Sequence, residues 1–252
     1  MESSTEDIKS YYDALPEVYG WDALCRMQIP KELARKTALD VACRRGKGVY
    51  KLAEQVGKSG KSIGADWRAD MLARARDGEA RAVQKCGFEQ SNIAFVQAYP
   101  EQLVQAVGEG VAHFVYVNCV LNLFFDPQEA LGQICRVLRP GGLLVCDTVV
   151  ASRPRDAAVV ARARELGNAV QAAPFRKDLM TWMARAGFDI TSIGAFSSEA
   201  VDPAWNADGE PTVPVVDTDE PVSFVSASIR MFKPDDIDRH SRKIVEDISE
   251  FR

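Results

Sequence analysis

Two short segments of the sequence carry residue types suited to holding a nucleoside. Gly46 lies in the loop between an expected strand and the helix after it, and Asp66 follows twenty positions later, at the end of the next strand. Ligands of open parallel sheets bind beyond the carboxyl ends of the strands, where a carboxylate can accept hydrogen bonds from both ribose hydroxyls. We therefore predict a nucleoside cofactor at these segments. The alternative is that Asp66 only caps a helix.

Cysteine and histidine positions argue against a metal centre. The six cysteines include no Cys-x-x-Cys pair, and His113 and His240 are the only histidines. A zinc site needs thiolates and imidazoles clustered at short spacing. We predict no metal site, and we expect most cysteines to be reduced thiols, buried as small hydrophobic residues. Cys43 and Cys119 each follow an expected strand, and we expect a structural rather than a redox role for both.

Apolar spacing predicts alternating strands and helices from residue 37 onward. Five β-α units in succession require a parallel sheet with helices on both faces, and two final strands could pair as an antiparallel edge. The expected fold is α/β and Rossmann-like: a doubly wound, mostly parallel seven-stranded sheet with an antiparallel edge strand, a helical N-terminal cap and a C-terminal helix. The expected strands are 37–42, 62–66, 92–98, 112–118, 143–147, 188–196 and 222–232, and the expected helices are 48–56, 69–85, 101–107, 127–138, 156–171 and 176–186.

We expect one domain over residues 1–252, because the sequence has no internal repeat and no obvious linker. Between residues 201 and 222 the chain has six acidic residues, four prolines and no Lys or Arg, which is typical of a solvated loop or of a mobile lid. The last helix would pack its apolar face on the domain or, alternatively, on a second copy. The expected parts are a cap at 1–36, a cofactor-binding core at 37–149, substrate-side helices, loop and last strands at 150–233, and a C-terminal helix at 234–252.

Charge and hydropathy exclude two classes of partner. Thirty-one Lys and Arg against 36 Asp and Glu give a net charge of −5, so no basic excess exists to bind a phosphate backbone. The longest apolar runs are far shorter than a membrane span, and residues 1–7 are acidic and polar, unlike a secretory signal. We expect a cytoplasmic protein, monomeric or homodimeric, that acts on a small molecule rather than on nucleic acid or at a membrane.

Four further features extend the nucleoside hypothesis. Leu39-Asp40-Val41, Asp66, Asn118 and the run Leu138-Arg139-Pro140-Gly141-Gly142 follow one another in an order that resembles the class I S-adenosylmethionine-dependent methyltransferases. The resemblance spans about residues 37–149 and implies S-adenosyl-L-methionine as the cofactor. In that family the first loop wraps the methionine end, the acid after the second strand holds the ribose, and the end of the third strand faces the adenine. Carried to this sequence, the cofactor-binding residues would be Asp40, Ala42, Gly46, Gly48, Asp66, Trp67, Ala98, Tyr99 and, beneath the sulfonium, Asn118.

The first loop departs from the pattern of that family. The family usually reads Asp-x-Gly-x-Gly-x-Gly, but the first two glycine positions here are Ala42 and Arg44. Glycine serves in such loops because the backbone adopts positive φ or approaches the ligand. The side chain of Arg44 must therefore point away from the cofactor or clamp its carboxylate.

Other stretches resemble the arsenite methyltransferases in particular. They include Val18-Tyr19-Gly20, Ala98-Tyr99-Pro100-Glu101-Gln102-Leu103, Asn118-Cys119-Val120-Leu121-Asn122-Leu123 and the run from Phe224 to Lys233. In that family three cysteine thiolates hold trivalent arsenic, a soft ion that prefers sulfur ligands. The matching positions here are Trp21, Ala169 and Val222, and none is a cysteine, although Cys25 lies near the first. The resemblance thus implies the cofactor site and argues against arsenite as the substrate.

The function expected from these features is methyl transfer to a small organic acceptor. Such catalysis depends mostly on aligning the acceptor lone pair with the methyl carbon, so no catalytic residue is identified. The expected substrate-side residues are Tyr11, Tyr19, Trp21 and Ala169, with helix packing as the alternative role for each tyrosine. Two alternatives remain open: a protein that uses the cofactor for a reaction other than methylation, and a non-catalytic binding protein.

Overall fold

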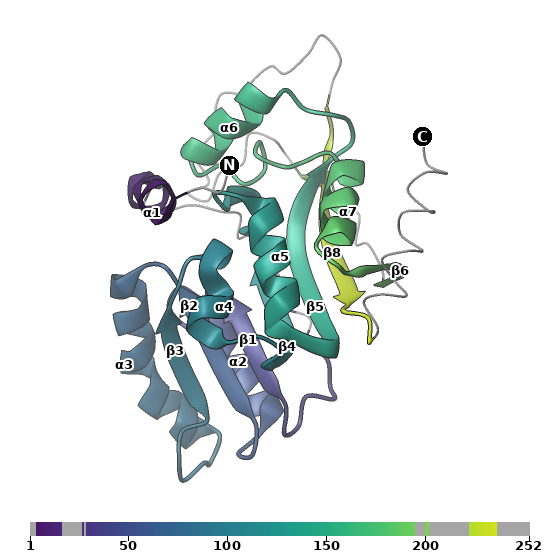
Figure 1. The fold of residues 1–252 in the computed structure, drawn as a ribbon. Coiled ribbons are helices and arrows are strands. Elements are labelled where there is room, and N and C mark those ends of the chain that lie inside the picture. Colours follow the sequence, from purple (N-terminus) through teal and green to yellow (C-terminus); the bar gives the residue numbers. More distant parts are fainter. Residues whose placement is uncertain (1–3, 17–26, 28, 195–199, 202–221, 236–252) are drawn as a thin grey trace.

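The computed structural model describes residues 4–16, 27, 29–194, 200–201 and 222–235. A mostly parallel sheet lies at its centre, with seven strands in the order β3-β2-β1-β4-β5-β8-β6 and the two-residue strand β7 (Ala200–Val201) paired to β8 (Figure 1). The other strands are β1 (Thr37–Val41), β2 (Lys61–Asp66), β3 (Ile93–Gln97), β4 (Ala112–Asn118), β5 (Leu138–Ala151), β6 (Asp189–Gly194) and β8 (Phe224–Phe232).

The strand order defines the edge at which a ligand would bind. Strands β1 to β5 are parallel, and the order reverses between β1 and β4, so their carboxyl ends meet at a switch point. Strand β8 runs antiparallel to both β5 and β6. The expected doubly wound, mostly parallel fold with an antiparallel strand at one end is confirmed, and β6 lies outside β8 at that end.

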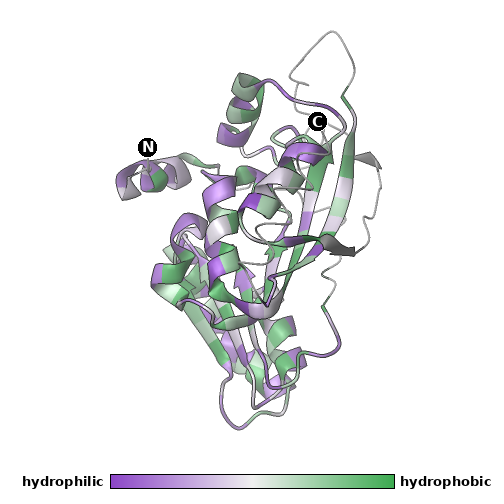
Figure 2. Ribbon diagram, turned by 45° about the vertical axis from the view of Figure 1, so that its right-hand side comes forward, coloured by the Kyte–Doolittle hydropathy of each residue, from purple (hydrophilic) through white to green (hydrophobic). Residues whose placement is uncertain are grey.

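Helices cover both faces of the sheet because each has one apolar stripe. In α2, the buried residues Val49, Leu52, Ala53 and Val56 repeat at helical spacing. Figure 2 shows hydrophobic positions along the central strands and hydrophilic positions on the surrounding helices. The helices are α1 (Thr5–Ala14), α2 (Lys47–Val56), α3 (Ala69–Lys85), α4 (Leu103–Val107), α5 (Pro127–Val137), α6 (Ala157–Glu165) and α7 (Arg176–Arg185), with short 3-10 turns η1 (Pro100–Gln102) and η2 (Leu121–Leu123).

Each of the two faces of the sheet packs against its own hydrophobic core. Leu52 and Val56 of α2 pack with Ala38, Phe114 and Val145 on one face. On the other face, residues of α5 and α7 pack against β1 and β5; they include Leu131, Ile134, Leu179 and Met183, with Leu39 and Leu144 from the strands. Alternate residues of each strand therefore belong to different cores.

Two expected boundaries were wrong. The helix expected over 156–171 ends at Glu165, because Gly167 takes a positive φ of 70° and Asn168 instead accepts hydrogen bonds from the backbone of Val170 and Gln171. The strand expected at 143–147 is longer at both ends: β5 begins at Leu138, contains a register shift, and continues beyond 147 to 151. Outside the described residues lie Tyr19, Trp21, Cys25, most of the 201–222 segment and nearly all of the expected C-terminal helix.

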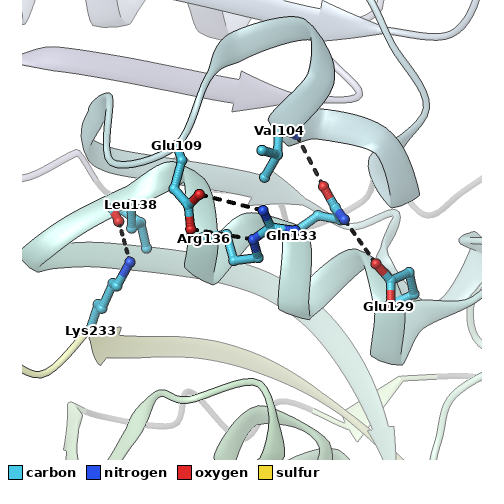
Figure 3. A network of polar contacts seen from close by, with 7 residues as sticks. All are labelled: Val104, Glu109, Glu129, Gln133, Arg136, Leu138 and Lys233. Carbon is cyan, nitrogen blue, oxygen red and sulfur yellow. Dashed lines mark hydrogen bonds and ion pairs between the residues drawn. The ribbon is translucent and has the colours of Figure 1, made fainter. Parts of the chain in front are cut away.

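Polar contacts at the amino ends of β4 and β5 join the elements there (Figure 3). Arg136 of α5 pairs with Glu109 at 3.4 Å, and Gln133 of the same helix accepts a hydrogen bond from the backbone of α4. The buried Lys233, which follows β8, donates to the carbonyl of Leu138 at 2.7 Å. The contacts of Arg136 and Lys233 lie at the edge opposite the switch point, and that of Gln133 joins two helices, so we assign all of them a structural role.

Candidate cofactor and acceptor site

The loop from β1 to α2 has the backbone of a glycine-rich loop, although other residues stand at its first two glycine positions. Ala42, Arg44 and Gly46 have φ values of 58°, 48° and 76°, so the three alternate positions are all left-handed. A left-handed conformation costs a non-glycine residue about 1–2 kcal/mol. At Gly46 space is restricted as well, since an added Cβ would lie 3.1 Å from atoms of Ala75 and Phe95. Strain of this kind is concentrated at ligand sites.

Relief of this strain is testable at Ala42. We expect Ala42→Gly to raise the free energy of unfolding by about 0.5–1 kcal/mol, because glycine adopts positive φ without a steric penalty. The control is Ala80→Gly at an exposed position inside α3, where the same substitution should lower stability by about 1 kcal/mol. Urea unfolding measures both. A loss of stability in Ala42→Gly similar to that of the control would contradict the strain argument.

Asp66 connects this loop to α3. Its carboxylate is 0 % exposed at the carboxyl end of β2; Oδ2 accepts a hydrogen bond from the backbone N–H of Arg44 at 2.8 Å, and Oδ1 accepts one from that of Arg68 at 2.9 Å. Burial raises the pKa of Asp66, although both backbone donors oppose this effect. Each carboxylate oxygen has a further lone pair, so these bonds leave acceptor capacity for a ligand. The residue therefore holds the loop and the start of the helix in place.

Asp40, which lies on β1 near Asp66 of the neighbouring β2, is also buried. Burial, with the nearby Asp66 carboxylate as a second cause, raises the pKa of Asp40 to about 8. Gly48 makes room for this side chain in the first turn of α2, because an added Cβ would lie 2.2 Å from Asp40 Oδ2. Asp40 and Gly48 were both expected in the site, and the structure places them next to each other.

Aromatic residues gather where the expected adenine side of the site lies. Trp67, Ala98 and Tyr99 pack together with Tyr12 of α1; the Tyr12 ring centroid lies 4.4 Å from that of Trp67 and 5.4 Å from that of Tyr99. For Tyr12, a cap tyrosine like Tyr11, the structure shows the packing role: with Ile8 it is the buried contact through which α1 docks on the sheet.

A buried carboxyl group holds α1 in this position. Glu101 is 4 % exposed and accepts hydrogen bonds from the Tyr12 hydroxyl at 3.0 Å and from the backbone N–H of Asp126 at 3.1 Å. Burial raises the pKa of Glu101 to about 7, against the opposing effect of these donors. Sequence reasoning missed the role of Glu101, because its partners lie far away in the chain.

The raised pKa of Glu101 gives stability a pH dependence of known sign. Between the ordinary value of 4.5 and about 7, the folded chain keeps a proton that the unfolded chain has lost. The stabilisation is therefore complete at low pH and is lost as the pH rises through about 7. We expect Glu101→Gln to remove this decrease of the free energy of unfolding with pH. The variant should therefore gain stability relative to wild type between about pH 5 and pH 7. Urea unfolding across this range tests it, with exposed Glu89→Gln as control; parallel curves for wild type and Glu101→Gln would contradict the assignment.

The expected substrate-side residues have different surroundings. Tyr11 donates its hydroxyl to the carbonyl of Leu123 at 2.8 Å and packs on Phe125, which are the contacts of a packing residue. Ala169 is buried, and its carbonyl accepts a hydrogen bond from Asn122 at 2.8 Å. Tyr19 and Trp21 lie outside the described residues.

The end of β4 carries the expected methyl-side residue. Asn118 is exposed and is in register with Asp147 on β5. Tyr116, two residues earlier on β4, donates its hydroxyl to Asp147 Oδ2 at 2.5 Å and lies 3.2 Å from Asn118 Oδ1. The three side chains therefore meet at the carboxyl edge of the sheet.

The two cysteines near this edge, Cys43 and Cys119, fit a structural role. Cys43 is buried and free, and burial raises its thiol pKa, so it is not an activated nucleophile. Cys119 is disulfide-bonded, which departs from the expectation of reduced thiols. No cluster of three potential metal ligands occurs among the described residues. Within the same residues, no helix is long and apolar enough to span a membrane.

The doubly wound sheet, the left-handed loop after β1 and the buried acid after β2 define an α/β domain of the nucleoside-binding class. A family model described as a methyltransferase domain matches residues 33–187. The chain belongs to this family, and the cofactor of such domains is S-adenosylmethionine.

Individual relatives agree with the family. Human arsenite methyltransferase is 30% identical over 185 residues, which are 71% of this chain and 49% of that protein. Demethylmenaquinone methyltransferase of Shouchella clausii is 29% identical over 142 residues, 56% of each protein. The crystal structure of an arsenic(III) S-adenosylmethionine methyltransferase from Chlamydomonas reinhardtii matches with a TM-score of 0.71 and 25% identity, covering 92% of this chain and 71% of that one. The chain spans about half the length of the first of these relatives.

Proposed function

We propose that this chain transfers a methyl group from S-adenosylmethionine to a small organic acceptor other than arsenite. The observation that carries the proposal is the left-handed loop at residues 42–46, which Asp66 holds next to the carboxyl ends of β1 and β4. Relatives that act on arsenite and on demethylmenaquinone support a small-molecule acceptor.

The residues at this edge fit the cofactor. Asp66 offers a buried carboxylate with remaining lone pairs for ribose hydroxyls, and the half-buried ring of Tyr99 offers a face for an adenine, beside the buried ring of Trp67 in the same aromatic cluster. We assign the methionine end to Asp40, Ala42, Gly46 and Gly48, the ribose and adenine to Asp66, Trp67, Ala98 and Tyr99, and the sulfonium side to Asn118. When bound, the cofactor supplies an electrophilic methyl carbon. The chain's own residues then orient the acceptor toward it.

Arsenite is excluded as the acceptor because the three positions that are cysteines in the arsenite methyltransferases hold other residues in this chain. Ala169 and Val222 are apolar, and Trp21 is the third residue. A trivalent arsenic ion needs soft sulfur ligands, and these side chains offer none. They favour an acceptor with an apolar surface.

The test measures S-adenosylhomocysteine release with arsenite and with organic acceptors as alternatives. We expect release that depends on an organic acceptor and no catalytic methylation of arsenite. Turnover of arsenite at the rate of a three-cysteine relative would refute the exclusion, and Cys25→Ser would then be the first variant to make.

A second candidate keeps the cofactor and changes the reaction. Its support is Arg44, which places a cationic residue where the family has glycine. This candidate predicts that the cofactor is bound but that S-adenosylhomocysteine release does not depend on any methyl acceptor. The same assay therefore separates the two functions.

A further inference from the structure

Polar side chains cross four neighbouring strands on one face of the sheet. Asp40 on β1 is in register with Tyr116 on β4, and Asp147 on β5 is in register with Ser228 on β8. Side chains directly opposite each other on adjacent strands point to the same face. Tyr116 and Asp147 are joined by a hydrogen bond of 2.5 Å, which links the two pairs into one row.

Two atoms of this row have unused hydrogen-bonding capacity. Asp147 is 7 % exposed and Ser228 is 9 % exposed. Within the part of the chain that the structure describes, neither Asp147 Oδ1 nor Ser228 Oγ has a hydrogen-bond partner. A buried polar atom without a partner costs about 1–3 kcal/mol, so a neighbouring pair of such atoms calls for an explanation.

The position of the row indicates that purpose. Asp147 is in register with Asn118, which ends β4 at the switch point, so the unused carboxylate oxygen lies at the edge where the cofactor's methyl group is expected. The Tyr116 hydroxyl occupies Oδ2 and fixes the plane of the carboxylate. Oδ1 accepts no hydrogen bond from the other members of the row, so this carboxylate oxygen is available to a donor from outside it.

We propose that Asp147, oriented by Tyr116 and assisted by Ser228, recognises the acceptor as an amine and stabilises the positive charge that methylation creates on its nitrogen. This inference rests on the proposed methyltransferase function. Methylation of a neutral amine forms an N–C bond from the nitrogen lone pair and breaks the C–S bond, whose electron pair stays on sulfur. The nitrogen then carries a positive charge and one proton in excess. Asp147 Oδ1 accepts a hydrogen bond from this nitrogen and stabilises its positive charge, and the excess proton leaves the ammonium product to solvent water.

An amine fits this site better than an alcohol or a thiol. A carboxylate interacts most strongly with a nitrogen that becomes cationic, because the attraction grows as the N–C bond forms. An alcohol would have to lose its proton to a much weaker base than its own conjugate base. A thiol acceptor gains little from a carboxylate, since S–H is a weak donor.

Three matched probes test the choice of acceptor: benzylamine, benzyl alcohol and benzyl mercaptan. We expect S-adenosylhomocysteine release with benzylamine, and binding of benzylamine to the S-adenosylhomocysteine complex at least about tenfold tighter than binding of benzyl alcohol by calorimetry. Preferred turnover of the alcohol or the mercaptan overturns this inference alone. Failure of the cofactor to bind, or release with none of the three probes, counts against the proposed function instead.

Three variants distinguish a role of Asp147 and Tyr116 in the reaction from a role in folding. Asp147→Asn should lower kcat/KM for benzylamine roughly 100-fold or more and weaken its binding, with the cofactor Kd unchanged. Tyr116→Phe, the positioning variant, should lower kcat more than it raises KM and should shift the pH profile. Its matched control is Tyr50→Phe, whose hydroxyl donates to the carbonyl of Ala75 away from the row. Unchanged turnover in Asp147→Asn overturns the inference.

Ser228 offers a readout that does not depend on activity. Because its hydroxyl has no partner, Ser228→Ala should leave the urea unfolding midpoint unchanged or higher while weakening benzylamine binding. The control is Ser62→Ala, which removes a buried hydroxyl that donates to the carbonyl of Val49 at 2.8 Å and should lower the midpoint. If the urea unfolding midpoint of Ser228→Ala falls as far as that of the control, Ser228 has a structural role, and its part in recognition is overturned.

Discussion

Replacement of Asp66 by alanine is expected to weaken S-adenosylmethionine binding by roughly 10- to 100-fold, corresponding to about 1.5–3 kcal/mol. Two effects add at this position. The variant removes the carboxylate proposed to hold the ribose, and it removes the acceptor for the backbone N–H groups of Arg44 and Arg68. The left-handed loop then loses its connection to α3. Isothermal titration calorimetry measures the change directly.

The control is a nearby acid that lacks these contacts. Asp70 lies at the start of α3, and its exposed carboxylate pairs with the side chain of Arg68 at 2.9 Å. Asp70→Ala changes charge in the same region, so it should alter the cofactor Kd by no more than about twofold. Equal effects of the two substitutions would show that general electrostatics, rather than Asp66 itself, governs binding.

Tyr12→Ala is expected to lower the free energy of unfolding by about 3–5 kcal/mol, the range for truncating a large buried aromatic side chain. The ring is 3 % exposed and packs between Trp67 and Tyr99, and its hydroxyl is a donor to buried Glu101. The variant thus leaves a cavity and an unsatisfied carboxyl group together. Because α1 docks through this ring, limited proteolysis should cleave α1 faster, and urea unfolding should give the magnitude.

Tyr12→Phe separates packing from hydrogen bonding. It keeps the aromatic contacts and removes the donor to Glu101, so the expected loss is only about 1 kcal/mol. If Tyr12→Ala costs no more than Tyr12→Phe, the ring does not hold α1 in place, and the docking of this helix would need another explanation.

The sequence was most informative where the signal is local. The helix at 69–85 and the strand at 112–118 have the bounds that were expected, because periodic apolar residues and the stop at Gly87 act within a few positions. The loop after β1 was assigned to the cofactor site from its place in the chain, but the positive φ of Ala42 and Arg44 was not predicted, because neither residue type carries a local signal for it.

Contacts between distant segments could not be predicted in the same way. Tyr12 and Glu101 are 89 positions apart, and Tyr116 and Asp147 are 31 apart. No periodicity or spacing relates such pairs, since only the strand order and the register bring them together. One signal was available: Asp147 interrupts an apolar run of β5, and a charge inside a buried strand needs a reason.

The late position of β8 in the chain has a consequence for how the protein is made. Nine consecutive residue pairs join β8 to β5, and β6 also pairs with β8. A ribosome that has released only the first 200 residues has therefore produced a sheet whose strand β5 still has an open edge, a template for pairing with other chains. The sheet closes only when residues 224–232 arrive and insert between two strands already made. Truncations before this point should consequently aggregate rather than yield a smaller working domain.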